Sequence, residues 1–117
     1  MTKSKKSIIN RIDEEKEKML RLFDGNDAAT LELIEPLVQN AVFMQYTLRE
    51  LQNSILDNGY TDDYVNGANQ HGIKISANVQ AYNSMVKNYN VIISKLAKYI
   101  SVDSKLDELD EFMAMYK

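Results

Sequence analysis

Apolar residues recur along this chain with the spacing of an α-helix, most regularly between residues 34 and 55. Asp27 can cap the start of this helix, because a carboxylate oxygen accepts hydrogen bonds from the free amides of the first turn. Gly59 can end it, since glycine tolerates the positive φ found after many helices. Pro36 lies inside the span and predicts either a kink or a short helix followed by a longer one. The apolar positions are three and four residues apart, which places them on one stripe of the helix: Ile34, Leu37, Ala41, Met44, Leu48, Leu51 and Ile55.

A second stripe with the same spacing follows between residues 79 and 100, and Ser76 is suited to cap its helix. Two helices of similar length that are joined by a linker are expected to pack antiparallel as a hairpin. Burial of each large side chain on their seam stabilises the fold by roughly 1.5–3 kcal/mol before entropy is counted. The second stripe consists of Val79, Tyr82, Val86, Tyr89, Ile93, Leu96 and Ile100.

The linker from 58 to 76 is polar and holds three of the four glycines and the single histidine. Tyr60 to Val65 is strand-like, Asn66-Gly67 is the preferred pair for a tight type I′ turn, and residues 72–75 can form a returning strand. A two-stranded hairpin is marginal alone, so it would have to pack on the helices or on a neighbouring subunit. The tyrosines of the linker and of the second stripe are predicted to be core residues: Tyr60, Tyr64, Tyr82 and Tyr89.

These patterns predict an all-α fold: an antiparallel helical hairpin core with flanking N- and C-terminal helices and an optional small β-hairpin in the 58–76 linker. The 117 residues suit a single domain. It divides into a basic N-terminal helix (1–25) ended by Gly25-Asn26, the helical hairpin (27–101) and an acidic amphipathic tail (104–117). The apolar face of the tail consists of Leu106, Leu109, Phe112, Met113 and Tyr116.

Charge is distributed unevenly, although the net charge is only −3. Residues 1–21 carry 7 basic and 4 acidic side chains, whereas residues 24–64 carry 8 acidic side chains and one arginine. Residues 72–100 carry 4 lysines and no acidic residue, and the tail is acidic again. Such alternation bears on association and partners. Charged solvent-facing helix surfaces are an equally good explanation of it.

The chain offers little material for catalysis. It has no cysteine, which excludes disulfides, thiolate metal sites and a cysteine nucleophile. His71 stands alone, and no metal-binding, phosphate-loop or nucleophile-elbow motif is present. A metal site at Asp62, Asp63 and His71 is conceivable but nonspecific. We therefore predict no enzyme activity, no cofactor and no metal. The apolar runs are too short to span a membrane and no signal-peptide core follows the basic start, so we expect a chain that is not secreted.

Basic residues in two regions suit nucleic-acid binding. One group is an N-terminal arm that leads into the first helix, and the other lies along the outer flank of the 76–101 helix. Lysines in such places neutralise phosphates and give salt-dependent affinity without base readout. Asparagine and glutamine can form hydrogen bonds with the edges of adenine. Residues of these types in and after the linker are Asn66, Asn69, Gln70 and Asn78. Such residues are also common in turns exposed to solvent. The predicted DNA-binding residues are Lys3, Lys5, Lys6, Arg11, Lys74, Lys87, Lys95 and Lys98.

Two motifs together resemble the small subunits of phage terminases, of the kind encoded by tailed phages and prophages of Gram-positive bacteria. The first is Asn66-Gly-Ala-Asn-Gln70 followed by Gly72-Ile-Lys74, and the second is Tyr82-Asn-Ser-Met-Val-Lys-Asn-Tyr89. The preceding helix, from Val38 to Met44 and on through Leu48 and Leu51, is also similar, so the resemblance covers roughly residues 33–100. The chain departs from the group at Ser76-Ala77, where many members have an Asn-Pro-like helix start.

The resemblance implies a DNA-packaging function in the host cytoplasm. Such subunits are not enzymes; they form ring-like oligomers, bind double-stranded phage DNA and deliver it to the large terminase subunit, which supplies the ATPase and nuclease. By this resemblance we expect Leu109, Phe112 and Tyr116 of the tail to contact the large subunit. The alternative is a helical protein-interaction module of a phage, structural, connector or regulatory, that does not bind DNA.

Overall fold

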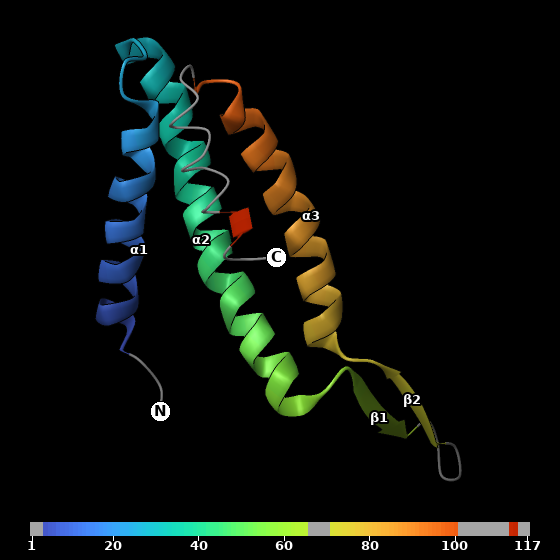
Figure 1. Ribbon diagram of the computed structural model, residues 1–117. Coiled ribbons are helices and arrows are strands. Elements are labelled where there is room, and N and C mark those ends of the chain that lie inside the picture. Colours follow the sequence, from blue (N-terminus) through green and yellow to red (C-terminus); the bar gives the residue numbers. More distant parts are fainter. Residues whose placement is uncertain (1–3, 66–70, 101–112, 115–117) are drawn as a thin grey trace.

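In the part of the chain that the structure describes, three α-helices form a layer with a small β-hairpin at one end (Figure 1). The structure, a computed structural model, describes residues 4–65, 71–100 and 113–114. The long central helix α2 lies between α1 and α3 and packs against both. The predicted helix-dominated fold with a small β-hairpin in the linker is thus confirmed. In chain order the elements are α1 (Lys5–Leu20), the short 3-10 helix η1 (Arg21–Phe23), α2 (Ala28–Asn58), β1 (Thr61–Val65), β2 (His71–Ile75) and α3 (Ala77–Ala97).

The ends of the helices are set by the residues that the sequence predicts. The side chain of Asp27 accepts a hydrogen bond from the Thr30 amide at 2.7 Å, and Ser76 accepts one from the Val79 amide at 3.1 Å. Both predicted N-caps are confirmed, and α3 begins regularly at Ala77 without the Asn-Pro start of the terminase group. Gly25 and Gly59 end the preceding helical segments with φ values of 100° and 84°, a region that favours glycine.

Pro36 does not divide the central helix. α2 runs through it as one element of 31 residues. The predicted alternative of a short helix followed by a longer one is therefore wrong, and a kink within one continuous helix stays a prediction. Proline removes the amide that would bond one carbonyl of the preceding turn. Because Pro36 is solvent-exposed, water can reach that carbonyl.

The predicted seam between α2 and α3 forms the main core, and Figure 1 shows the two helices running antiparallel. Leu48 and Ile93 are fully or almost fully buried in one apolar cluster, which also contains the end of the α3 stripe. Three members of the predicted α2 stripe, Leu37, Met44 and Leu51, are only half-buried.

The core is wider on α2 than one stripe, because this helix has two neighbours. Val38, Val42 and Gln45 are buried in addition to the predicted stripe. Val42 and Gln45 line a small hollow of about 40 Å³ together with Ile12 of α1, which places them on the side that faces α1. The apolar face of α1 and η1 completes this second seam through Ile12, Met19, Leu22 and Phe23.

Three polar pairs connect α2 with α3. The Gln45 amide donates to the Tyr89 hydroxyl at 2.8 Å in the buried centre, and Gln52 donates to Tyr82 at 3.2 Å nearer the surface. At the hairpin end, Asn78 donates to Ser54 at 2.6 Å. The predicted core role of Tyr89 is confirmed, whereas Tyr82 is half-buried and packs against the core from its edge. The hydroxyl of each tyrosine is paired. Among the described residues, the carbonyl Oε1 of Gln45 is buried without a hydrogen-bond partner, and Gln45 lines a hollow that is large enough to admit a water molecule.

The β-hairpin extends from the end of the helical hairpin (Figure 1). Its strands are antiparallel, with Thr61 opposite Ile75 and Val65 opposite His71. Asn66-Gly67, the predicted tight turn, lies outside the described residues. Tyr60, predicted as core, is 68% exposed, because the hairpin projects beyond the helices instead of folding back on them. The side chain of Tyr64 lies outside the described residues.

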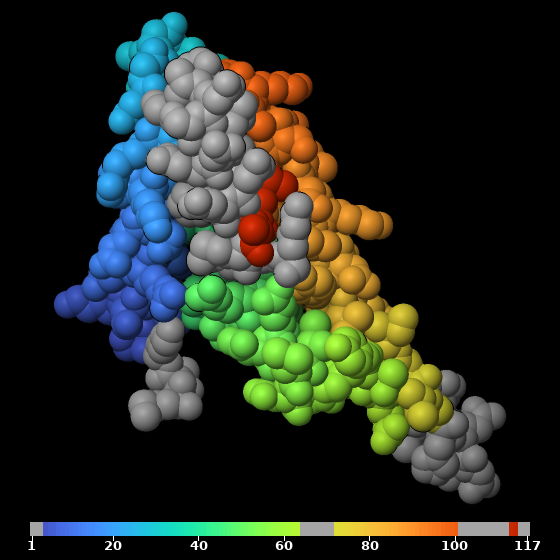
Figure 2. Space-filling model, in the orientation of Figure 1, coloured from blue at the N-terminus to red at the C-terminus, as the bar shows by residue number. Residues whose placement is uncertain are grey.

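Most of the tail lies outside the described residues. Met113 and Ala114 are helical, as predicted for this segment, and Met113 is half-buried against the core cluster. In Figure 2 these two residues lie between the surfaces of α2 and α3. At this point the tail contacts its own chain. Among the described residues, no helix is both long and apolar enough to cross a membrane.

Candidate nucleic-acid interface

The outer face of α3 is a basic surface built on one rigid element. Lys87, Lys95 and Lys98 are all exposed on the side of the helix that faces away from its buried residues. With about 100° per residue, Lys87 and Lys98 lie almost in line along the helix, roughly 16 Å apart, and Lys95 stands to one side of them. We call these three lysines with their exposed polar neighbours the α3 lysine face. The neighbours are Asn83, Ser84, Asn88, Asn90 and Ser94.

The composition of this face suits a phosphate backbone. No acidic residue occurs between 72 and 100, so nothing on α3 itself neutralises the lysines. Lys95 and Lys98 share a shallow hollow of about 330 Å³ with Asn90, Val91 and Ser94. Lysine ammonium groups provide charge, while serine and asparagine add hydrogen-bond donors that reach phosphate oxygens. The arrangement can therefore bind a polyanion without contacting base edges.

The N-terminal basic residues do not join the α3 lysine face. Lys5, Lys6 and Arg11 are exposed on α1, and α2 separates this helix from α3 (Figure 1). Lys5 and Lys6 also belong to the start of α1, which lies at the opposite end from Lys98 on α3. Lys3 lies outside the described residues. The two basic regions that the sequence distinguishes are therefore also separate in space.

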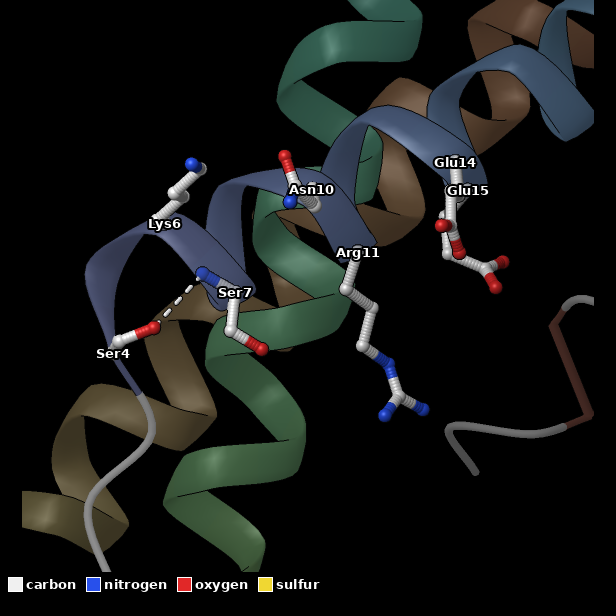
Figure 3. Close-up of a pocket in the computed structure, with 7 residues that line it drawn as sticks. All are labelled: Ser4, Lys6, Ser7, Asn10, Arg11, Glu14 and Glu15. Atoms are coloured by element: carbon white, nitrogen blue, oxygen red, sulfur yellow. Dashed lines mark hydrogen bonds between the residues drawn. The ribbon is translucent and has the colours of Figure 1, made fainter.

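The hollow on α1 shows why this second region is weaker. It has a volume of about 600 Å³ and is lined by α1 and the residue before it. Figure 3 shows Lys6 and Arg11 pointing to different sides, with Glu14 and Glu15 next along the helix. Carboxylates so close to the basic groups oppose the approach of phosphate. The hollow has walls from one helix only, so it cannot enclose a small ligand.

The linker residues contribute less to a DNA surface than their sequence suggests. Lys74 is exposed on β2 and pairs in register with Asp62 of β1, so its charge is partly balanced. Asn78 is half-buried and donates to Ser54, which directs its amide toward the protein. Asn66, Asn69 and Gln70 lie outside the described residues, as do Leu109, Phe112 and Tyr116 of the predicted large-subunit contact.

Two further observations concern the titratable groups in the described part of the chain. Hydrogen bonds from the side chain and the backbone amide of Thr30 hold the pKa of Asp27 below its usual value of 3.8, as expected for a helix cap. In residues 4–65, 71–100 and 113–114, no three histidine or carboxylate side chains lie together as a metal site would require.

The molecule is electrically polarised across the helix layer. Exposed carboxylates lie on the other two helices. On α2 they are Glu32, Glu35, Glu50 and Asp57, of which Glu35 forms a 3.2 Å ion pair with Lys16 of α1, and on α1 they are Asp13, Glu14 and Glu17. The α3 lysine face is the acid-free side of this arrangement. A polyanion is thus expected to approach α3 and to be repelled from the open surface of α2.

Comparisons of the chain with protein-family models, with curated proteins and with solved structures found no match. Sequence reasoning located the three lysines of the α3 lysine face but did not single out Asn83, Asn88, Asn90 and Ser94 beside them. Two features of the sequence could have identified these four residues. The segment from 72 to 100 has no acidic residue, and the four polar residues lie on the side of the helix opposite the second apolar stripe.

Proposed function

We propose that this chain is a DNA-packaging recognition subunit of the phage terminase type. It binds double-stranded phage DNA through the α3 lysine face, self-associates, and delivers the DNA to a large subunit that carries the ATPase and nuclease. It has no catalytic role of its own. The observation that carries the DNA-binding role is the acid-free, lysine-bearing outer face of α3. The packaging role rests on the resemblance in the two motifs of residues 66–74 and 82–89.

The electrostatics of the helix layer support a backbone-binding mode. Three lysines that each neutralise a phosphate release about three counterions for each chain, so log K is expected to fall against log salt with a slope near −3 per engaged chain. A single chain of this kind binds weakly, and several chains on one duplex add their contacts. DNA binding and self-association therefore reinforce each other in this proposal.

The test is a gel-shift titration of duplex DNA at low and moderate salt. We compare the wild type with the triple variant K87E/K95E/K98E. The variant is expected to lose most of its affinity. Its plot of log K against log salt is expected to be less steep by about 3 per engaged chain. Absence of any shift by the assembled wild type at low salt, or wild-type affinity in the variant, contradicts the DNA-binding role.

A matched control uses the same change in net charge on the other basic region. The variant K5E/K6E/R11E is expected to weaken binding less, because Glu14 and Glu15 already lower the potential around those residues. An equal loss in both triple variants would show that total charge, not the α3 lysine face, determines affinity.

The second candidate, a protein-interaction module without DNA binding, is favoured by the exposed apolar residues of the β-hairpin. It predicts co-purification with another phage protein that persists in K87E/K95E/K98E. The terminase proposal instead predicts capture of the large subunit that is lost when residues 104–117 are deleted.

A further inference from the structure

The β-hairpin leaves both its apolar side chains and its strand edges uncovered. Ile73 is 70% exposed and Ile75 is 55% exposed, and they lie on the same face of β2 because they are two residues apart. The sheet of the described residues consists of β1 and β2 alone, so each strand has one outer edge. Exposed apolar edge strands of this kind are templates for pairing with another strand.

The backbone groups that face outward can be identified from the register. Ser76 donates its amide to the Tyr60 carbonyl at 2.9 Å, so these two residues form a hydrogen-bonded pair. Such pairs alternate along an antiparallel ladder. Asp62 and Lys74 are therefore the next hydrogen-bonded pair. Asp63 and Ile73, which lie opposite each other one residue further along, belong to a pair without mutual hydrogen bonds, so their amides point away from the partner strand.

The hairpin is firmly connected to the helical body. The Tyr60–Ser76 hydrogen bond continues the ladder to the start of α3, and the Asp62 carboxylate accepts from the Ala77 amide at 3.4 Å. The two contacts link β1 and the residue before it to the start of α3 and its N-cap. A protein that pairs with the hairpin would therefore take a defined orientation relative to the α3 lysine face.

We propose that the occupant of these edges is a second copy of this chain, and that β1 of one copy pairs antiparallel with β2 of the next. Charge selects this arrangement. Pairing of β1 with β1 would bring Asp62 and Asp63 beside the same acids, and pairing of β2 with β2 would bring Lys74 beside Lys74. Pairing of β1 with β2 repeats between copies the Asp62–Lys74 neighbourhood that already exists within each hairpin.

The proposed contact is head-to-tail, so each copy uses its β1 edge for one neighbour and its β2 edge for another. Contacts of this kind close into a ring when the rotation between copies allows it and otherwise extend as a chain. Addition of strands also covers the outer amides of Asp63 and Ile73 and places Ile73 and Ile75 in contact with cross-strand side chains of the neighbouring copy. This inference deepens the oligomer of the proposed function and rests on that part of it.

Proline at an outward-facing position removes an edge amide without removing a hydrogen bond inside the hairpin. The variants are Asp63→Pro, which blocks β1, and Ile73→Pro, which blocks β2. The mass of the full chain is measured by light scattering at tens of micromolar. The wild type is expected above the 13.4 kDa of a single chain, and each variant at 13.4 kDa. A wild type at 13.4 kDa overturns the proposal, as does either variant that keeps the wild-type mass.

Mixing the two variants separates head-to-tail pairing from the symmetric arrangements. The free β2 edge of Asp63→Pro can pair with the free β1 edge of Ile73→Pro, so the mixture is expected to form a dimer of twice the single-chain mass. Circular dichroism checks that the helices are retained. A mixture that stays monomeric overturns the proposal. So does a wild-type mass in Asp63→Pro alone, which indicates β2–β2 pairing.

Leu33 provides the matched control for the apolar side chains. It is 68% exposed, almost equal to Ile73, but lies near the start of α2 at the other end of the molecule. Ile73→Ser is expected to lower the oligomer mass, and Leu33→Ser is expected to leave it unchanged. Equal effects of the two serine variants overturn the role of the hairpin. Because the mass needs no DNA, a failed gel shift and a failed assembly are distinguishable.

Discussion

The helical hairpin and the β-hairpin both carry apolar residues at regular spacing, but these residues have opposite environments. Along α2 and α3, residues such as Leu48 and Ile93 are buried by partners from the same chain. In the β-hairpin, Ile73 and Ile75 repeat with the period of a strand and remain exposed. Two long helices can cover each other's stripe, whereas two five-residue strands in the described chain leave both sheet faces without a covering layer. The comparison separates residues that stabilise the single chain from residues available to another molecule.

The largest expected effect is the loss of a buried side chain from the α2–α3 seam. Leu48→Ala removes a side chain with no exposed surface and leaves a cavity, so the free energy of unfolding is expected to fall by about 2–5 kcal/mol. Urea titration followed by circular dichroism measures it. Leu56→Ala, on the same helix but 77% exposed, is the control and should change stability by less than about 0.5 kcal/mol. Similar losses in both variants would contradict the burial of the seam.

A graded effect is expected when the hydroxyl is removed from three tyrosines. Tyr89→Phe leaves the buried Gln45 amide without its acceptor and should cost about 1–3 kcal/mol of stability. Tyr82→Phe should cost less, since Gln52 is half-buried and water can replace the hydroxyl. Tyr60→Phe, next to the β-hairpin, should have almost no effect. Thermal unfolding of the three variants measures the order, and a Tyr60 effect as large as that of Tyr89 would remove the contrast between the two regions.

The smallest expected effect concerns the pH dependence of the α2 cap. The pKa of Asp27 is lowered in the folded protein by its hydrogen bonds to Thr30, so the ionised cap stabilises the fold above the unfolded value near 3.8. This contribution is lost as the pH falls through the lower, folded pKa. Asp27→Asn keeps a capping oxygen that does not titrate. The stability difference between wild type and variant, followed by acid titration, should diminish below pH 3.8; a difference that grows there contradicts the cap.

The sequence predicts the local features of the helical hairpin well because their causes are local. Asp27, Ser76 and Gly59 act on neighbouring amides and dihedrals, and the spacing of three and four residues selects the seam whatever surrounds it. The burial of Val38, Val42 and Gln45 depends instead on where α1 packs, which a single stripe does not reveal. The same limit applies to the basic residues: the three lysines of α3 share a helix, but the position of Lys5 and Arg11 relative to them depends on tertiary packing.

The β-hairpin was predictable in its existence and not in its details. Alternating apolar residues and turn formers indicate two strands, but they do not reveal whether the strands fold back on the helices or project beyond them. The exposure of Tyr60 could not be predicted either, because a half-apolar strand has the same sequence whether a helix or another chain covers it.

The Gln45–Tyr89 and Gln52–Tyr82 pairs lie one heptad apart on both helices, and this spacing determines the alignment of α2 with α3. Apolar stripes of equal period can slide past each other by seven residues and still bury most of their surface. A slide that set Gln45 against Tyr82 would set Tyr89 against Val38, a side chain with no amide to donate to the Tyr89 hydroxyl. A buried polar group without a partner is costly, so one alignment is favoured over its neighbours. The distance between the α3 lysine face and the β-hairpin is then the same in every copy, as the proposed assembly of identical subunits on a duplex requires.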